Sequence, residues 1–152
     1  NIEIDKTIFQ TNVIGAIATL DAATKIFLAQ GHGHLVGMSS FSAFSPLPTS
    51  AAYSASKAAL TNYMNAMRLE LINKKINVTV IHPGFIKTDI APDMGKYPFV
   101  IEADVAAQQM VRAIEGKKVN VIVPAMPWKA AKGLMNLMPD PLLAMMFAKF
   151  MK

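Results

Sequence analysis

The chain has 152 residues, of which 53% are hydrophobic, a formal net charge of +5 and no cysteine. This length suffices for one domain with its own core, and the lack of cysteine excludes a disulfide framework and a thiolate zinc site and favours a cytoplasmic location. The sequence has no basic stripe with interleaved aromatic residues that would predict nucleic-acid binding, and no signal peptide or uninterrupted apolar run of about 18 residues that would predict membrane insertion.

A long helix is predicted over residues 2–30, because its apolar residues recur in steps of three and four. Asn12 and Gly15 interrupt this pattern, since both are poor residues for a helix interior. A short strand is predicted over residues 34–39, and a loop with two prolines over residues 41–49. The remaining predicted elements are a helix from Tyr53 to about Asn73, a strand over 77–82, an irregular loop over 85–100, a helix over 103–115 and a strand over 119–123.

Strands that alternate with helices of this length are typical of βαβ units with right-handed crossovers. We therefore expect an α/β fold with a doubly wound parallel sheet, of which about three strands and their flanking helices are present. Residues 124–152 differ in composition, because they are dense in methionine and leucine, and they predict an apolar helical tail of the same domain.

Tyr53 and Lys57 stand four residues apart in an alanine-rich stretch without glycine or proline, which favours a helix. Residues four apart share one face of a helix. A free tyrosine has a pKa of about 10, and a nearby positive charge lowers the pKa of a phenol, so the pair is suited to general acid/base catalysis. The alternative is a pair of helix residues that are in register by chance.

The carboxyl ends of the predicted strands carry further polar residues. Ser40 follows the first strand, and the second strand leads into the segment Pro83–Thr88. Ligands bind at this edge of open parallel sheets, so both should converge with the start of the Tyr53 helix. The alternative role for Ser40 is a strand-end cap. A serine hydrolase is excluded because Gly37–Phe41 lacks the second glycine of a nucleophile elbow, and the spacing of the three histidines predicts no metal site.

Four segments together resemble the carboxyl-terminal half of a short-chain dehydrogenase/reductase, in the order and at the spacings of that family. They are Asn12-Val-Ile-Gly15, Gly33-His-Leu-Val-Gly-Met-Ser-Ser40, Tyr53-Ser-Ala-Ser-Lys57 and His82-Pro-Gly-Phe-Ile-Lys-Thr88. The resemblance implies that residues 1–123 are the catalytic half of a Rossmann-like domain.

The resemblance also implies a role for each matched residue. Tyr53 would be the general acid/base, Lys57 would lower the pKa of its phenol and hold the nicotinamide ribose, and Ser40 would donate a hydrogen bond to the substrate oxygen. Asn12 would hold a water molecule on the proton relay; the alternative is a packing defect in its helix. The residues implied to bind the cofactor are Tyr53, Lys57, Pro83, Gly84, Ile86 and Thr88.

The glycine-rich turn that receives the pyrophosphate in this family is absent from the sequence, and Gly31-x-Gly33-x-x-x-Gly37 does not replace it. We therefore expect the amino-terminal nucleotide-binding half to belong to a longer parent enzyme, which binds NAD or NADP and converts a small-molecule substrate. The isolated chain is expected to be inactive, and the alternative function is a non-catalytic interaction or dimerisation module. In the family, the helices at 2–30 and from Tyr53 commonly form a homo-oligomer interface.

Two interpretations of the tail over residues 124–152 are open. Its apolar helical stripes can cover the substrate cleft, which favours a lipophilic substrate. Alternatively, the same stripes, with Trp128 and flanking lysines, can form an amphipathic segment in peripheral contact with a membrane.

Overall fold

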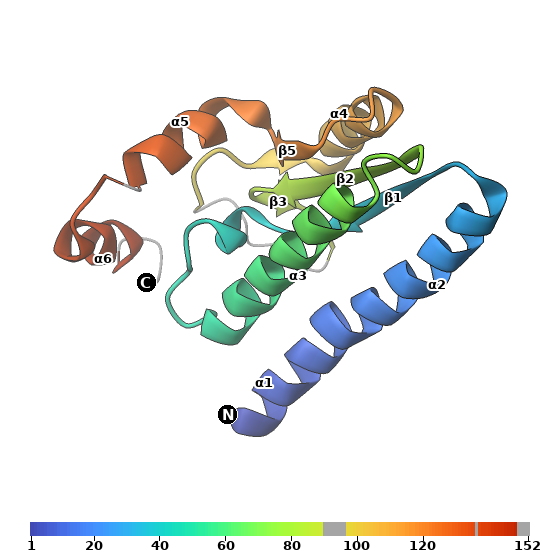
Figure 1. Ribbon diagram of the computed structural model, residues 1–152. Helices are drawn as coiled ribbons and strands as arrows, with labels where there is room; N and C mark the ends of the chain where they lie inside the picture. The colour runs from blue at the N-terminus through green and yellow to red at the C-terminus, as the bar shows by residue number, and fades with distance from the viewer. Residues whose placement is uncertain (90–96, 136, 149–152) are drawn as a thin grey trace.

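A computed structural model describes residues 1–89, 97–135 and 137–148 and has a three-stranded parallel sheet at its centre (Figure 1). The strand order is β1–β2–β5, so β2 pairs with a neighbour on each side. The strands are β1 (Gly33–Met38), β2 (Ile76–Pro83) and β5 (Asn120–Val123). The expected parallel sheet of three strands is confirmed.

Helices cover both faces of this sheet, as a doubly wound fold requires. Val78 and Val80 of β2 pack in one apolar cluster with α3 (Ala51–Glu70), whereas Ile81 packs in another with α4 (Ala103–Glu115). Successive side chains of a strand point to opposite faces, so α3 and α4 lie on opposite sides of β2. Burial on both faces explains why β2 reads as a nearly continuous apolar run rather than an alternating one.

The predicted helix over residues 2–30 is continuous but changes type in its middle. It consists of α1 (Ile2–Phe9), a π-helical segment η1 (Gln10–Gly15) and α2 (Ala16–Gln30). The interruption expected at Asn12 and Gly15 is therefore this π-helical segment. Figure 1 shows the helix running alongside α3 at the edge of the molecule.

By length and composition alone, this first helix is apolar enough to cross a membrane, although few of its residues are buried in the structure. The criterion of an uninterrupted apolar run did not identify this helix, because polar residues are spread along it. The same test is met by core helices of soluble proteins. Here Val13 and Leu20 are buried, and Leu20 belongs to the core cluster formed with α3 and β1.

Two predicted loops contain short elements. The loop over 41–49 begins with a 3-10 helix, η2 (Phe41–Ala43). The prediction of an irregular loop over 85–100 was wrong at its start, where β3 (Ile86–Lys87) pairs in parallel with β4 (Ile101–Glu102). A two-residue strand leaves no periodicity in the sequence, which explains the error. Residues 90–96 of that loop lie outside the described part of the chain.

The tail contains α5 (Ala125–Met135) and α6 (Asp140–Ala148). Trp128 and Met135 are buried in a cluster with Phe41, and Phe147 packs against the same cluster. The division of the domain at residue 124 stays a prediction, as do the membrane contact of the tail and the cytoplasmic location. Phe150, which the sequence places on the apolar stripe of the tail, lies outside the described residues.

Gly37 gives a direct test of how closely α3 packs on β1. A Cβ atom added at this glycine would overlap the side chain of Met64, which is fully buried on α3. We expect Gly37→Ala to lower the free energy of unfolding by about 1–3 kcal/mol in urea titrations, because the core must shift to admit it. A Cβ atom added at Gly133 of α5 would meet no other atom within 4 Å, so the control Gly133→Ala should be neutral or stabilising, and equal effects would contradict this packing.

Candidate active site

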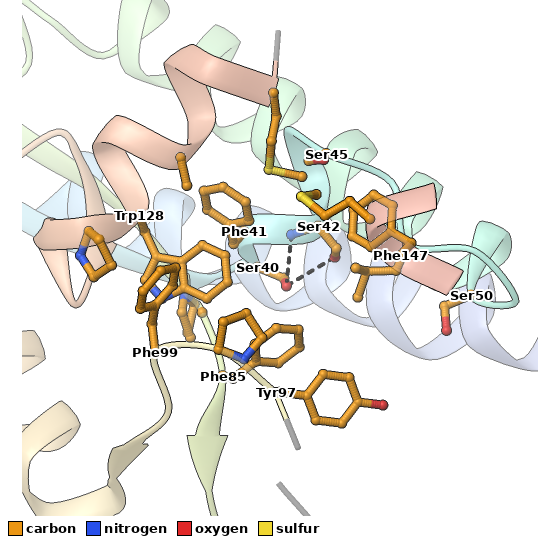
Figure 2. A pocket seen from close by; sticks show the side chains of 18 of the residues that line it. Ser40, Phe41, Ser42, Ser45, Ser50, Phe85, Tyr97, Phe99, Trp128 and Phe147 are labelled. Carbon is orange, nitrogen blue, oxygen red and sulfur yellow. Dashed lines mark hydrogen bonds between the residues drawn. The ribbon is translucent and has the colours of Figure 1, made fainter. Parts of the chain in front are cut away.

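A cavity of about 880 Å³ lies beside the carboxyl ends of β1 and β2. Its wall includes Ser40 after β1, Tyr53 on the first turn of α3, Pro83 and Gly84 at the end of β2, and Trp128 on α5. The structure therefore brings together the three segments that the sequence predicted to converge. Figure 2 shows Ser40 at the middle of this cavity, with aromatic side chains around it.

Ser40 is held in place by its neighbour Ser42. The Oγ atom of Ser40 accepts a hydrogen bond from the backbone N–H of Ser42 (3.2 Å) and another from the Ser42 hydroxyl (3.0 Å), as the dashed lines in Figure 2 mark. A serine hydroxyl has two acceptor positions and one proton. Because both acceptor positions are used, the proton of Ser40 is left to be donated. Ser40 thus caps η2, which was the alternative role, and also lines the cavity.

Lys57 lies next to Tyr53, as their spacing predicts. Its Nζ atom is 5.6 Å from the centre of the Tyr53 ring and donates a hydrogen bond to the carbonyl oxygen of Met38 at the end of β1 (3.0 Å). Partial burial lowers the pKa of the Lys57 ammonium. Tyr53 is 36% exposed and borders the cavity, so a ligand in the cavity can contact its side chain.

Asn12 does not line the cavity, and two hydrogen bonds link it to the backbone carbonyl of Tyr53. The Nδ2 atom of Asn12 donates to Ser56 Oγ (3.1 Å), and Ser56 Oγ donates to the carbonyl oxygen of Tyr53 (2.7 Å). Ser56 is fully buried. These bonds fix the turn of α3 that carries Tyr53 against the π-helical segment. The role of Asn12 in holding a water molecule stays a prediction.

The predicted cofactor residues after β2 do not all reach the cavity. Pro83 and Gly84 line it, whereas the half-buried Ile86 and the exposed Thr88 are absent from its wall. Ile86 instead packs in the cluster of β2, β5 and α4 that contains Ile81. Cofactor contacts of Ile86 and Thr88 stay predictions.

His82 links Ser40, which lines the cavity, to Asn120 of β5. The sequence analysis did not predict this role. Its ring is fully buried. Its Nδ1 atom is 3.4 Å from the carbonyl oxygen of Ser40, and its Nε2 atom is 3.1 Å from Asn120 Oδ1. The Nδ2 atom of Asn120 in turn donates to Asn65 Oδ1 on α3 (3.0 Å). This chain of contacts joins β1, β2, β5 and α3 directly behind Ser40.

Burial lowers the pKa of His82, and the hydrogen bonds to Asn120 and Ser40 oppose that shift without reversing it. Lys132 adds to the lowering by charge repulsion. The ring also stacks against Phe44, with the ring centres 4.4 Å apart. His82 is therefore a neutral positioning group, and nothing in the spacing of the histidines indicated it, because its partners come from three other elements.

This arrangement can be compared with known proteins. A family model described as short chain dehydrogenase matches residues 2–97, which include Asn12, Ser40, Tyr53 and Lys57. The chain belongs to the short-chain dehydrogenase family. The expected family and its Rossmann-like fold are thus confirmed.

Relatives of the chain are longer than the chain itself. It is 40% identical to an uncharacterized oxidoreductase of Myxococcus xanthus, over 85% of this chain and 53% of that protein. It is 31% identical to dehydrogenase/reductase SDR family member 7B of Bos taurus, over 80% of this chain and 41% of that protein. The chain spans about half the length of these relatives.

Among solved structures, a short-chain dehydrogenase from Burkholderia cenocepacia in complex with NADP resembles this chain with a TM-score of 0.77 and 27% sequence identity. The match covers 88% of this chain and 57% of that chain. Members of this family thus use a nicotinamide cofactor.

The buried ring of His82 predicts a pH dependence of stability. Its pKa is lowered in the folded state, whereas an unfolded histidine titrates near 6.5. Below that value the unfolded state binds more protons, so stability falls as the pH drops from about 7 toward the folded-state pKa, by at most about 1.4 kcal/mol per pH unit. Urea unfolding across this range should show a shallower slope for His82→Gln.

His32 offers a matched control, because its ring is exposed and contacts Gln30 rather than the core. The variant His32→Gln should keep the pH slope of the unmodified protein. His34 is also partly buried and has a lowered pKa, so the slope in His82→Gln should be reduced but not abolished. An unchanged slope in that variant would show that His82 is not held neutral.

Proposed function

We propose that the whole protein is an NAD- or NADP-dependent oxidoreductase that interconverts a carbonyl and an alcohol, with Tyr53 as general acid/base. One observation carries the proposal. One cavity combines the partly exposed side chain of Tyr53 with a Ser40 hydroxyl whose two acceptor positions are already used, while the Lys57 ammonium stands 5.6 Å from the centre of the tyrosine ring.

The roles of the side chains follow from their hydrogen-bonding capacity. Ser40 donates its free proton to the substrate oxygen and so orients the carbonyl. In the reductive direction, Tyr53 gives its hydroxyl proton to that oxygen as the carbonyl becomes an alcohol, and in the oxidative direction the phenolate takes the proton back. Lys57 places a positive charge beside the tyrosine ring. When bound, the nicotinamide cofactor supplies or accepts the hydride.

The residues of this chain fit one end of such a cofactor. An ammonium has three N–H donors, and the bond from Lys57 to Met38 uses one, which leaves two for ribose hydroxyls. Pro83 and Gly84 offer backbone at the sheet edge where ligands bind. The NADP complex of the Burkholderia cenocepacia relative supports this assignment. No glycine-rich turn for the pyrophosphate occurs in this sequence, so cofactor binding is proposed for the protein at the length of its relatives.

The removal of the phenol tests the proposed acid/base role. We expect Tyr53→Phe to lower kcat on the order of a hundred- to ten-thousand-fold, since the variant lacks the proposed proton donor. Tyr63 lies on the same helix and packs against the core cluster, so Tyr63→Phe should retain activity. Steady-state assays of both variants with the nicotinamide cofactor provide the measurement, and a Tyr53→Phe enzyme with more than half the parental rate would exclude this role.

A second candidate function is association through the long helices, as a homo-oligomer or as a non-catalytic module. One observation favours it: Ile4, Ile14 and Ile26 on the first helix are 59%, 51% and 63% exposed. Apolar side chains spaced along one helix are suited to a helical partner.

We expect the chain to be a dimer or larger in light scattering, and Ile14→Glu to reduce its mass toward that of the monomer. Ile72 is 65% exposed but lies beyond the end of α3, so Ile72→Glu should leave the mass unchanged. A monomeric parent protein would refute this association.

A further inference from the structure

The cavity beside Ser40 has two chemically different sides. The segment from Ser40 to Tyr53 contributes most hydroxyl groups of its wall and Tyr97 contributes one more, whereas the tail contributes aromatic, methionine and leucine side chains. None of the described residues that line the cavity carries a charge. Most hydroxyl groups of the wall therefore lie on the segment that carries the proposed reacting atoms.

Trp128 forms the centre of the apolar side. Its side chain is buried, and its ring centre lies 4.4 Å from that of Phe41, 5.4 Å from that of Phe85 and 5.7 Å from that of Phe99. Figure 2 shows these rings gathered on one side of Ser40, and Phe147 on the other. This packing gives a preformed apolar wall.

Lys132 of the tail offers no partner for an acidic ligand inside the cavity. The Nζ atom of Lys132 lies 3.5 Å from the centre of the Phe44 ring, and Lys132 is not part of the cavity wall. A carboxylate in the cavity would thus lose its hydration without gaining an ion pair from the described wall, which is strongly unfavourable. The charge distribution argues against acidic substrates.

We propose that the site takes an uncharged lipophilic alcohol or ketone. Its oxygen meets Ser40 and Tyr53, while its hydrocarbon part lies along Trp128 and the tail. The inference rests on the proposed function and narrows its substrate class. A volume of about 880 Å³ is that of pockets that enclose drug-sized ligands, which cover about 300–1,000 Å³. A short polar diol would leave most of this apolar surface unused.

The chain provides its own reporter, because Trp128 is its single tryptophan. We suggest titrating the protein with 1-decanol, with decanoate of the same chain length, and with 1,2-butanediol, while following tryptophan fluorescence without cofactor. We expect saturable binding of 1-decanol, at least tenfold weaker binding of decanoate, and no binding of the diol at the same concentrations. Between 1-hexanol and 1-decanol, affinity should rise by about tenfold for every two methylene groups.

Two exposed leucines of the tail provide a matched pair of variants. Leu134 lines the cavity and is 62% exposed, whereas Leu137 is 83% exposed and does not line it. Leu134→Glu should weaken 1-decanol binding about tenfold, and Leu137→Glu should change it less than twofold. Ala130→Glu, at a second exposed position of the wall, repeats the test if Leu134→Glu fails to fold.

Decanoate binding as tightly as 1-decanol would overturn the proposal. The same holds for a signal that does not saturate, or for equal effects of the two leucine variants, since either would indicate partition onto the surface. These outcomes are independent of Tyr53 chemistry. An active Tyr53→Phe enzyme would refute the proposed mechanism and leave 1-decanol binding intact, whereas a preference for decanoate would refute the substrate class alone.

Discussion

The attachment of α3 to the end of β1 is the constraint on which the candidate site depends. Ser39, the residue before Ser40, donates its hydroxyl proton within a buried contact to the carbonyl oxygen of Lys57 (3.0 Å) and lies 2.7 Å from Thr61 Oγ1. Lys57 returns a bond to the carbonyl of Met38. An unpaired buried hydroxyl would cost about 1–3 kcal/mol, so these reciprocal bonds fix the helix start relative to the strand end. Ser40 and Tyr53 face one cavity as a result.

A second set of buried polar contacts supports Ser40 from behind. His82 stands on the central strand between the Ser40 carbonyl and Asn120 of β5, and Asn120 reaches Asn65 on α3. Buried polar groups that are fully paired give a core one defined arrangement. The position of Ser40 at the sheet edge therefore depends on residues that do not line the cavity.

The sequence predicted those features of the structure that depend on a periodic pattern or on residues close together in the chain. The period of α3 predicted a buried face of Leu60, Tyr63, Met64, Met67 and Leu71. Tyr63 is only partly buried against the core, and the other four are buried. The sequence analysis missed contacts between distant elements. The contact between Ser40 and Ser42 was predictable in principle, because a serine side chain commonly bonds to the backbone two residues further along in a local turn. The contacts of His82 and Trp128 were not predictable from the sequence, since their partners are determined by how β2, β5 and the tail pack. The cofactor contacts predicted for Ile86 and Thr88 stay predictions, because no contact within the chain bears on them.

The contact between Gly84 and Trp128 connects the sheet edge beside the cavity to the tail. A Cβ atom at Gly84 would overlap the indole ring, so the glycine allows Trp128 to lie against the end of β2. The hydroxyl groups that would act on a substrate come from the Ser40–Tyr53 segment, whereas much of the apolar wall comes from residues after Pro124. The proposed reaction and the proposed substrate preference thus depend on different segments of the chain. Changes in the tail can alter what binds while the contacts of Ser40, Tyr53 and Lys57 stay in place.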